Sequence, residues 1–389
     1  MANRKLFTLF FIQLFLLGIG GSVVGPLIPI LSGSFDIGLD IIGTTLSLNA
    51  FGLLVASLFS GILSERFGKK NILSIGSILF TASFLSLYFS GNYVLFTISY
   101  LLFGISWGTI VVNSNSIISD CFDSNRSSII IRLNIGFLLG AAFAPLIVSG
   151  VLFFDISWRL IFISIALVNL ILFMLIMLFK HDNLGNKKST ENFIILLSTN
   201  RGLFTSIIII FCGIISFLHF GMGFSFGAWF TNYFESLNVP VSISSIILSL
   251  NLFVFCAGML LQSSLVNKFS EKKLMQFFSG CAFIFLFASF LVDHLIIKIL
   301  FITFFNFSFS GIATIALSLA IKQKPRHSGS ITSIINSYGF TGTIIFQYIA
   351  GYLSENISAS SIFYTSLSAL LLLVLFTSIL RIYPGRTTK

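Results

Sequence analysis

Amide side chains recur within the long apolar stretches of this chain, and they are its best candidates for binding a polar molecule. Asn336, Thr343 and Gln347 follow helical spacing, which places them on one face of a helix. Amides both donate and accept hydrogen bonds, so they suit the hydroxyl or carboxylate groups of a solute. Hydrogen bonding between helices is the other use of such groups, and both interpretations stay open. The amides concerned are Asn49, Asn113, Asn134, Asn251, Asn306, Asn336 and Gln347.

Three further side chains are candidates for contact with a solute. Arg132 would attract an anion if it faces inward, whereas a long basic side chain near a helix end can also extend to the membrane surface. A histidine side chain ordinarily titrates near neutral pH, so His219 could bind solute, carry a proton or pack as a neutral ring. Trp107 could stack on a sugar ring, although aromatic residues also collect at membrane interfaces.

Acidic residues are absent from the middle of every apolar stretch. They lie near expected outer loops (Asp36, Asp40, Asp155, Glu235, Asp293, Glu355) or near expected inner loops (Glu65, Asp120, Asp123, Asp182, Glu191, Glu271). A lipophilic cation needs a buried acid to balance its charge. The sequence therefore favours a neutral or anionic solute. The four cysteines have no metal-binding spacing, and we expect neither a metal nor a cofactor.

The elements that position these residues follow from composition. The chain has 389 residues, of which 56% are hydrophobic and 9% charged, and its mean hydropathy is +1.03. A soluble domain is about 25% charged, so this composition indicates an integral membrane protein. The net charge of +10 comes from short basic clusters between apolar runs rather than from one basic face, which argues against nucleic-acid binding.

The apolar runs predict about twelve transmembrane helices, because one crossing needs about 20 residues. With the N-terminus in the cytoplasm, all but two of the 22 basic residues (Arg159 and Lys298) lie at or near the inner side, which predicts cytoplasmic termini. The expected spans are approximately 6–31, 41–63, 71–91, 94–118, 128–153, 158–180, 203–232, 241–265, 273–292, 296–320, 329–353 and 359–381.

The two halves of the chain resemble each other. Leu46–Phe51 (LSLNAF) matches Leu248–Phe253 (LSLNLF) 202 positions further on, and Asn134 and Asn336 are related by the same offset. We therefore predict an all-α membrane protein with two pseudo-symmetric six-helix bundles, formed by residues 1–180 and 203–389 and joined by a cytoplasmic linker at 181–202. Together the bundles are expected to enclose a central cavity.

A loop motif identifies the family that the chain resembles. Gly61–Lys70 reads GILSERFGKK between the second and third spans. It is similar to the cytoplasmic loop signature G-x-L-x-D-R-x-G-R/K-R/K of the major facilitator superfamily, with Glu65 in place of Asp. Glu65 could pair with a basic neighbour or face the N-terminal end of another helix, for which the resemblance suggests residues 328–330. Gly61 and Gly68 are expected to allow close helix approach and a tight turn. The second-half loop has Ser263, Asn267 and Ser270 at the matching positions, so we place the latch in the first half. The implied gating residues are Gly61, Glu65, Arg66, Gly68, Lys69, Lys70 and Asp120.

Within that superfamily the fourth and fifth spans resemble fucose-permease-like sugar carriers. Asn115, Asp120, Leu133-Asn134 and Pro145 match the pattern, with Asn134 where His is usual and Val111 where an acid is expected. Proton-driven drug exporters fit less well, because their G-P-x-x-G-G motif keeps only Pro145 here.

These features predict a non-enzymatic carrier that moves a small polar solute, neutral or anionic and sugar-like by resemblance, through alternating access. The expected partners are that solute, the lipid bilayer and, if transport is coupled, protons; we expect a monomer in the plasma (inner) membrane. Efflux of hydrophobic or anionic compounds is the alternative within transport, and a transport-inactive membrane sensor is the alternative of another class.

Overall fold

The computed structural model describes residues 2–121, 126–178, 206–266, 268–323 and 327–379. These residues are almost entirely helical, and no strand occurs among them. Helices are expected in a bilayer because each satisfies its own backbone hydrogen bonds where water is absent. Within the described ranges, eleven helices are long and apolar enough to cross a membrane. A further long helix, α15, stands where the eleventh predicted span was expected. The all-α prediction is therefore confirmed.

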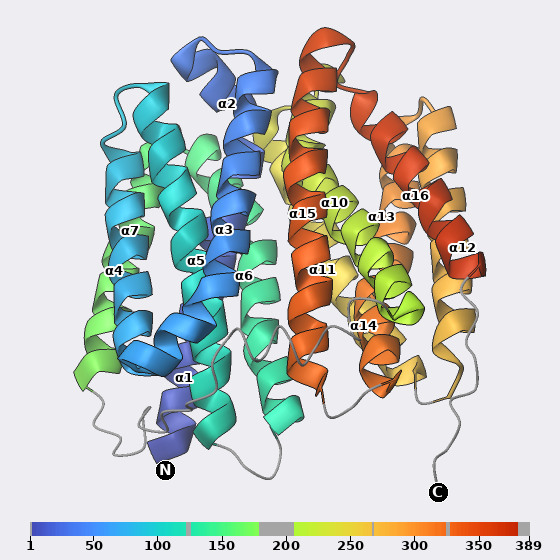
Figure 1. The fold of residues 1–389 in the computed structure, drawn as a ribbon. Coiled ribbons are helices and arrows are strands. Elements are labelled where there is room, and N and C mark those ends of the chain that lie inside the picture. Colours follow the sequence, from blue (N-terminus) through green and yellow to red (C-terminus); the bar gives the residue numbers. More distant parts are fainter. Residues whose placement is uncertain (1, 122–125, 179–205, 267, 324–326, 380–389) are drawn as a thin grey trace, which may run out of the picture. The chain divides into compact units, whose positions relative to one another are not determined.

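The chain separates into two compact units. Unit 1 comprises Met1–Thr190 together with Ala228–Ser249, and unit 2 comprises Glu191–Gly227 together with Leu250–Lys389. The helices confined to unit 1 are α1 (Ala2–Ser22), α2 (Val24–Phe35), α3 (Leu39–Phe67), α4 (Lys69–Tyr88), α5 (Tyr93–Cys121), α6 (Arg126–Phe153) and α7 (Arg159–Leu178). Those confined to unit 2 are α12 (Glu271–Leu291), α13 (Leu295–Phe309), α14 (Ile312–Gln323), α15 (Ser328–Asn356) and α16 (Ser361–Ile379). Two more helices (Figure 1), α10 (Ile207–Ser236) and α11 (Val241–Leu265), are divided between the units, because the end of α10 and the start of α11 lie in the segment Ala228–Ser249 of unit 1.

This division differs in one respect from the expected bundles. The segment Ala228–Ser249, which the repeat assigns to the second half, clusters with the first. The predicted linker at 181–202 lies outside the described residues, so the boundaries 1–180 and 203–389 stay a prediction.

Two of the predicted spans are interrupted. The first is α1 followed by α2, and Pro26 explains the break at Val23: it lacks a backbone N–H, and its ring crowds the carbonyl four residues earlier, at Ser22. The tenth is α13 followed by α14, which are separated by Ser310 and Gly311. Each interruption leaves backbone groups that another element must satisfy.

Glycine sets the closest helix contacts in unit 1. A Cβ added to Gly104 of α5 would lie 2.1 Å from the carbonyl oxygen of Asn49 in α3, and one added to Gly140 of α6 would lie 1.9 Å from that of Phe15 in α1. Such contacts are typical of membrane helices, which associate by packing rather than by the hydrophobic effect. Small residues at these positions therefore bring α3 onto α5 and α1 onto α6.

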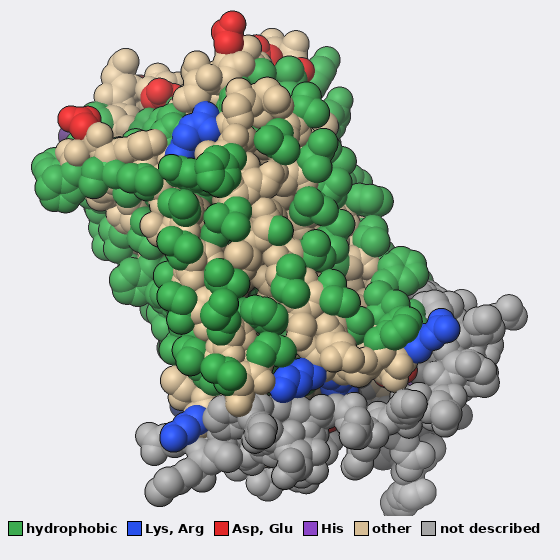
Figure 2. Space-filling model, turned by 90° about the vertical axis from the view of Figure 1, so that its left-hand side faces the viewer, with side chains coloured by type: hydrophobic (Ala, Val, Ile, Leu, Met, Phe, Trp, Pro, Cys, Tyr) green, Lys and Arg blue, Asp and Glu red, His purple; other side chains and the backbone are tan. Residues whose placement is uncertain are grey.

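The surface of unit 1 has the polarity of a membrane protein. On the face over α4 and α7, hydrophobic side chains cover the middle, Lys and Arg lie mainly toward one end, and most of the visible Asp and Glu lie at the other (Figure 2). Large exposed residues on these helices include Ile75, Ile78, Leu167, Ile171 and Met174. Exposed apolar side chains of this kind are expected where lipid replaces water.

Candidate functional site

The motif Gly61–Lys70 forms the connection between α3 and α4. Gly68 has a φ of 90°, a left-handed conformation that favours glycine, so the predicted tight turn is present. Lys69 follows it and pairs with Asp120 in the last turn of α5, with 2.5 Å between Lys69 Nζ and Asp120 Oδ2. Lys70 Nζ donates to the carbonyl of Met177 at 3.2 Å, near the end of α7. The motif thus ties three helices of unit 1 together at one end.

Other motif residues make fewer contacts. Glu65 and Arg66 are exposed, and the Arg66 guanidinium lies 5.3 Å from the centre of the Phe67 ring. Glu65 forms no ion pair with any residue in the described ranges, so its partner at residues 328–330 stays a prediction. The expected close approach at Gly61 has no counterpart, because a Cβ there would meet no described atom within 4 Å.

The predicted amides of unit 1 are engaged to different degrees. Asn49 is 5% exposed and its Nδ2 donates to the carbonyl of Tyr100 at 2.7 Å. Asn113 is fully buried and donates to Thr109, while its Oδ1 has no partner in the described structure. Asn134 is half-buried and donates to Asn115 Oδ1 at 3.2 Å and to the Ile130 carbonyl at 2.8 Å. Asn49 therefore serves the α3–α5 contact, whereas Asn134 joins a half-buried pair of amides between α5 and α6.

The predicted amides of unit 2 also differ in how many hydrogen bonds they make. Asn306 Nδ2 donates to Asn251 Oδ1 at 3.1 Å, which joins α13 to α11. Thr343 and Gln347 are 5% exposed; Thr343 donates to its own helix at Gly339, and Gln347 Nε2 donates to the carbonyl of Phe224 in α10 at 3.2 Å. Asn336 is half-buried and has no hydrogen bond to a residue in the described ranges. Asn336 is thus the amide of α15 best placed to bind a solute.

The three non-amide candidates differ as well. His219 is 5% exposed, its Nε2 lies 2.9 Å from the carbonyl of Phe309, and its ring stacks on the Phe309 ring with 4.1 Å between centroids. Since a carbonyl only accepts, Nε2 carries the hydrogen and Nδ1 is left as an acceptor without a described partner. Arg132 is exposed, which favours extension to the membrane surface. Trp107 is 7% exposed and packs on Phe137 at 5.2 Å between ring centres, which favours a role in the core of unit 1.

The break between α13 and α14 is held by a residue that the sequence analysis did not identify. Gln262 of α11 is fully buried, and its Nε2 donates to the carbonyls of Phe307 at 2.9 Å and Ser308 at 3.0 Å. Its Oε1 accepts from the backbone N–H of Gly311 at 3.1 Å. One amide thereby replaces several helical hydrogen bonds, and the lone Gln in an apolar helix was the signal for it.

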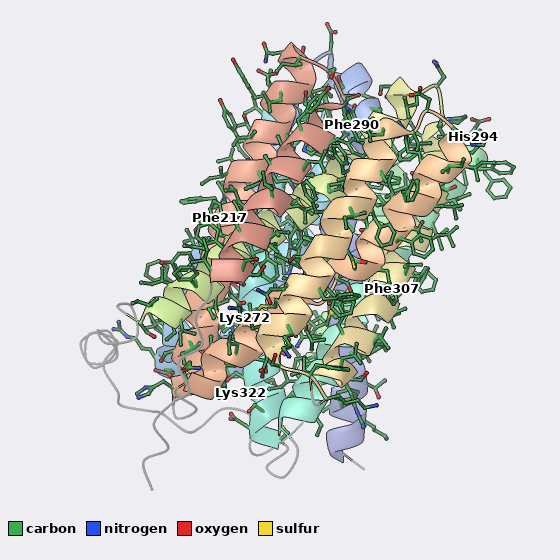
Figure 3. The ribbon with its side chains drawn as sticks, turned by 90° about the vertical axis from the view of Figure 1, so that its right-hand side faces the viewer. Phe217, Lys272, Phe290, His294, Phe307 and Lys322 are labelled. Atoms are coloured by element: carbon green, nitrogen blue, oxygen red, sulfur yellow. The ribbon has the colours of Figure 1, made fainter. Side chains whose placement is uncertain are left out.

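Unit 2 also holds an ion pair that the sequence analysis missed. Lys322, in the last turn of α14, pairs with Glu271, the first residue of α12. Figure 3 labels Lys322 together with Lys272, which follows Glu271 in the chain, at one end of the unit, with His294 at the other. The second half therefore carries an ion pair as well, while the placement of the latch in the first half stays a prediction. The sequence contained the signal, since Glu271 and Lys322 lie 202 positions after Lys69 and Asp120.

Segments of α10 and α11 pack within unit 1. A Cβ on Gly25 of α2 would lie 2.9 Å from Cα of Ala228. Thr231 Oγ1 donates to the carbonyl of Gly25 at 3.2 Å, and Ser249 Oγ donates to that of Ala142. Hydrogen bonds and close packing thus attach these segments to α2 and α6.

Metal binding finds no support in the part of the chain that the structure describes, where no three His, Cys, Asp or Glu residues come together. The acidic residues among these elements lie near helix ends, at positions 36, 40, 65, 120, 155, 235, 271, 293 and 355. Polar chemistry within the spans is therefore left to amides, hydroxyls and one imidazole.

A bundle of apolar helices with internal amides, ion pairs at helix ends and an internal repeat is typical of multi-pass membrane transporters. Residues 10–347 match the family model of the Major Facilitator Superfamily, and the chain belongs to that family. The predicted resemblance is confirmed, and both the family and the fold are those of membrane transporters rather than enzymes.

Individual relatives are more distant. The chain is 26% identical over 340 residues to a protein TsgA homolog of Buchnera aphidicola, covering 85% of this chain and 83% of that one. It is also 26% identical over 195 residues to the quinolone resistance protein NorA of Staphylococcus aureus, covering 49% of this chain and 48% of NorA.

Solved structures agree on the fold. A mutant of the nucleoside transporter NupG superposes with a TM-score of 0.82 at 16% identity, over 98% of this chain and 100% of NupG. A D-xylose-proton symporter superposes with a TM-score of 0.79 at 15% identity, over 97% of both chains. At these identities the likeness shows the fold alone.

Proposed function

We propose that this protein is a secondary carrier that moves a small polar solute, neutral or anionic, by alternating access. The observation that carries the proposal is the combination of amides within the spans and carboxylates confined to helix ends among the described residues. A cationic solute at mid-membrane would lack a counter-charge, which costs several kcal/mol. Hydroxyl and carboxylate groups, in contrast, match the amide donors.

Within this proposal, three groups, one in unit 1 and two in unit 2, are the candidates for contact with the solute. Asn336 offers an amide with no described partner. In the Asn134–Asn115 pair, the amide atoms that do not take part in the hydrogen bond between the two side chains can bind the solute. His219 offers Nδ1 as an acceptor, because its other nitrogen is fixed on Phe309. A solute that both donates and accepts hydrogen bonds, as a sugar does, matches the chemistry of each of these groups.

A carrier must also open and close. The contacts that attach α10 and α11 to α2 and α6 in unit 1 include a hydrogen bond at Thr231, another at Ser249 and a close packing contact at Gly25. Hydrogen bonds between membrane helices are worth about 0.6 kcal/mol on average, so these contacts are weak enough to release during a transport cycle.

The test is solute uptake into proteoliposomes with labelled sugars and organic anions, with and without a pH gradient. We expect flux of at least one of these solutes, and we expect Asn336→Ala to weaken its binding about tenfold. Asn356→Ala is the matched control, because Asn356 is an exposed amide at the end of the same helix that donates only to Tyr352 among described residues. Absence of flux for every solute, or equal effects of the two substitutions, would overturn the proposal.

Efflux of hydrophobic or anionic compounds is the second candidate function, and the similarity to NorA favours it. The assay separates the two, because dye or quinolone extrusion without sugar or anion uptake would support efflux. The scarcity of mid-span carboxylates in the described helices predicts that a cationic dye would not be exported.

A further inference from the structure

Two buried amides of unit 1 converge on one residue of α4. Gln13 of α1 and Asn169 of α7 are both fully buried. Gln13 Nε2 donates to Ser77 Oγ at 2.8 Å, and Asn169 Nδ2 donates to the Ser77 carbonyl and to Thr81 Oγ1, both at 2.9 Å. Gln13 Oε1 and Asn169 Oδ1 have no hydrogen-bond partner among the described residues. Two amide oxygens that require a donor therefore lie beside the same turn of α4.

The adjoining part of α5 carries two more groups of this kind. A Cβ on Gly76, the residue before Ser77, would lie 2.9 Å from Cγ2 of Thr109, so α5 passes this turn of α4 at Thr109. Asn113 and Ser114 follow about one helical turn later, and both are fully buried. Asn113 Oδ1 and Ser114 Oγ also have no partner in the described ranges. The name buried polar layer is used below for Gln13, Asn113, Ser114 and Asn169.

Helix packing alone does not require polar side chains at these positions. The 202-residue offset between the halves carries Asn113 and Ser114 to Ile315 and Ala316 of α14, and both of these residues are buried. Unit 2 therefore builds the corresponding turn from apolar side chains. A buried acceptor without a donor destabilises the folded protein, whereas an apolar group of similar shape does not. The buried polar layer thus calls for a ligand that donates hydrogen bonds.

The chemistry of the layer selects its ligand. Three of its unpaired atoms are amide oxygens and the fourth is a hydroxyl, so all four are neutral. A cation there would lack a counter-charge, because the carboxylates of the described helices lie near helix ends. Water carries no charge and donates two hydrogen bonds, so two molecules can serve all three amide oxygens. Water also suits an amide in either orientation, because it accepts hydrogen bonds as well.

We propose that the buried polar layer is a binding site for two water molecules, which join α1, α5 and α7 beside Ser77 of α4. Hydrogen bonds through an ordered water are nearly as favourable as direct ones, so the waters stabilise unit 1 where its side chains do not reach each other. The proposal concerns unit 1 by itself and does not depend on the proposed carrier function.

Brief X-ray irradiation of the purified full chain tests the proposal. Irradiation converts bound water into hydroxyl radicals, which oxidise the side chains next to that water even when bulk solvent does not reach them, and mass spectrometry locates the products. Leu14 and Ile110 are the reporters, because both are fully buried and lie within about one helical turn of the layer. Phe84 and Phe103 are the internal control: they are fully buried in the same unit, with 4.9 Å between ring centres. Aromatic rings react with hydroxyl radicals more readily than aliphatic side chains, so burial without water is the only reason for slow oxidation of this pair.

In the unaltered protein we expect Leu14 and Ile110 to be oxidised several-fold faster than the two phenylalanines. Gln13→Leu combined with Asn169→Leu removes two amides of the layer and should lower both reporters to the rate of the phenylalanines. Asn71→Leu, which removes an exposed amide of α4, is the matched control and should leave the rates unchanged. Equally slow oxidation of reporters and phenylalanines in the unaltered protein would overturn the proposal, whether or not the double variant folds.

Thermal unfolding separates water from a cation, the other ligand that oxygen atoms bind. We expect the same unfolding midpoint in sodium, potassium and choline chloride at equal concentration. A ligand that binds only the folded protein raises the midpoint as its concentration increases. A midpoint that rises with sodium or potassium in the unaltered protein, but not in the Gln13→Leu, Asn169→Leu variant, would assign the layer to a cation and overturn the proposal.

Discussion

Gly25 is the position at which a single methyl group should displace a segment of α10 from unit 1. A Cβ there would lie 2.9 Å from Cα of Ala228 and 3.1 Å from its carbonyl oxygen. Both are backbone atoms, which cannot rotate away as a side chain can. Gly25→Ala should therefore move α10 away from α2 and lengthen the hydrogen bond from Thr231 to Gly25, which is 3.2 Å.

The magnitude follows from the overlap. Carbon atoms pack at about 3.5–4.0 Å, so α10 must retreat by roughly 0.7 Å. Overpacking of this kind costs about 1–3 kcal/mol. Since about 1.4 kcal/mol corresponds to a tenfold change, the population with this contact open should rise about five- to 100-fold.

A buried reporter on α10 measures that population. Asn232 is 7% exposed, and a cysteine placed there by Asn232→Cys, in a background without the four native cysteines, should react slowly with a maleimide. Gly25→Ala should accelerate the reaction by the same factor, about five- to 100-fold. Gly33→Ala is the matched control in α2, because a Cβ there meets no described atom within 4 Å. Equal labelling rates in the two variants would refute this account of the contact.

Two further predictions concern helix packing. Gln262→Leu removes the hydrogen bonds that hold the break between α13 and α14. At about 0.6 kcal/mol for each bond, the unfolding free energy should fall by roughly 2 kcal/mol, which a lower midpoint of thermal unfolding would report. Gln276→Leu on α12 is the control and should change that midpoint far less, because Gln276 is half-buried and has no described side-chain hydrogen bond. Gly140→Ala places a methyl group 1.9 Å from the carbonyl oxygen of Phe15 and should abolish the monodisperse peak in size-exclusion chromatography, whereas Gly150→Ala on the same helix should not, because it meets no described atom within 4 Å. A folded Gly140→Ala protein would contradict the packing of α1 on α6.

Much of the fold could be predicted because hydropathy and periodicity determine where the membrane-spanning helices lie. The apolar runs gave the spans, and the Gly61–Lys70 motif gave the family and the turn at Gly68. The interruption of the tenth span was not predicted, because Ser310-Gly311 is unremarkable in sequence and its stabilising partner, Gln262, comes from another helix. Side-chain partners of this kind depend on how helices pack, which local pattern does not encode.

The candidate site was less predictable for the same reason. Asn49 and Asn336 look equivalent as amides in apolar helices, yet one donates to Tyr100 and the other has no described partner. Only the rotation of each helix decides between those outcomes. The Glu271–Lys322 pair, in contrast, could have been found by applying the 202-residue offset to every charge.

The exchanged signs of the two ion pairs bear on the descent of the chain. If one ancestral half was duplicated, the two copies began with the same sign at each position, and one of them later inverted both residues. A single inversion would have left two like charges side by side, so the two changes were under pressure to follow each other closely. Among descendants of that duplication, positions 271 and 322 should therefore vary together, as should positions 69 and 120.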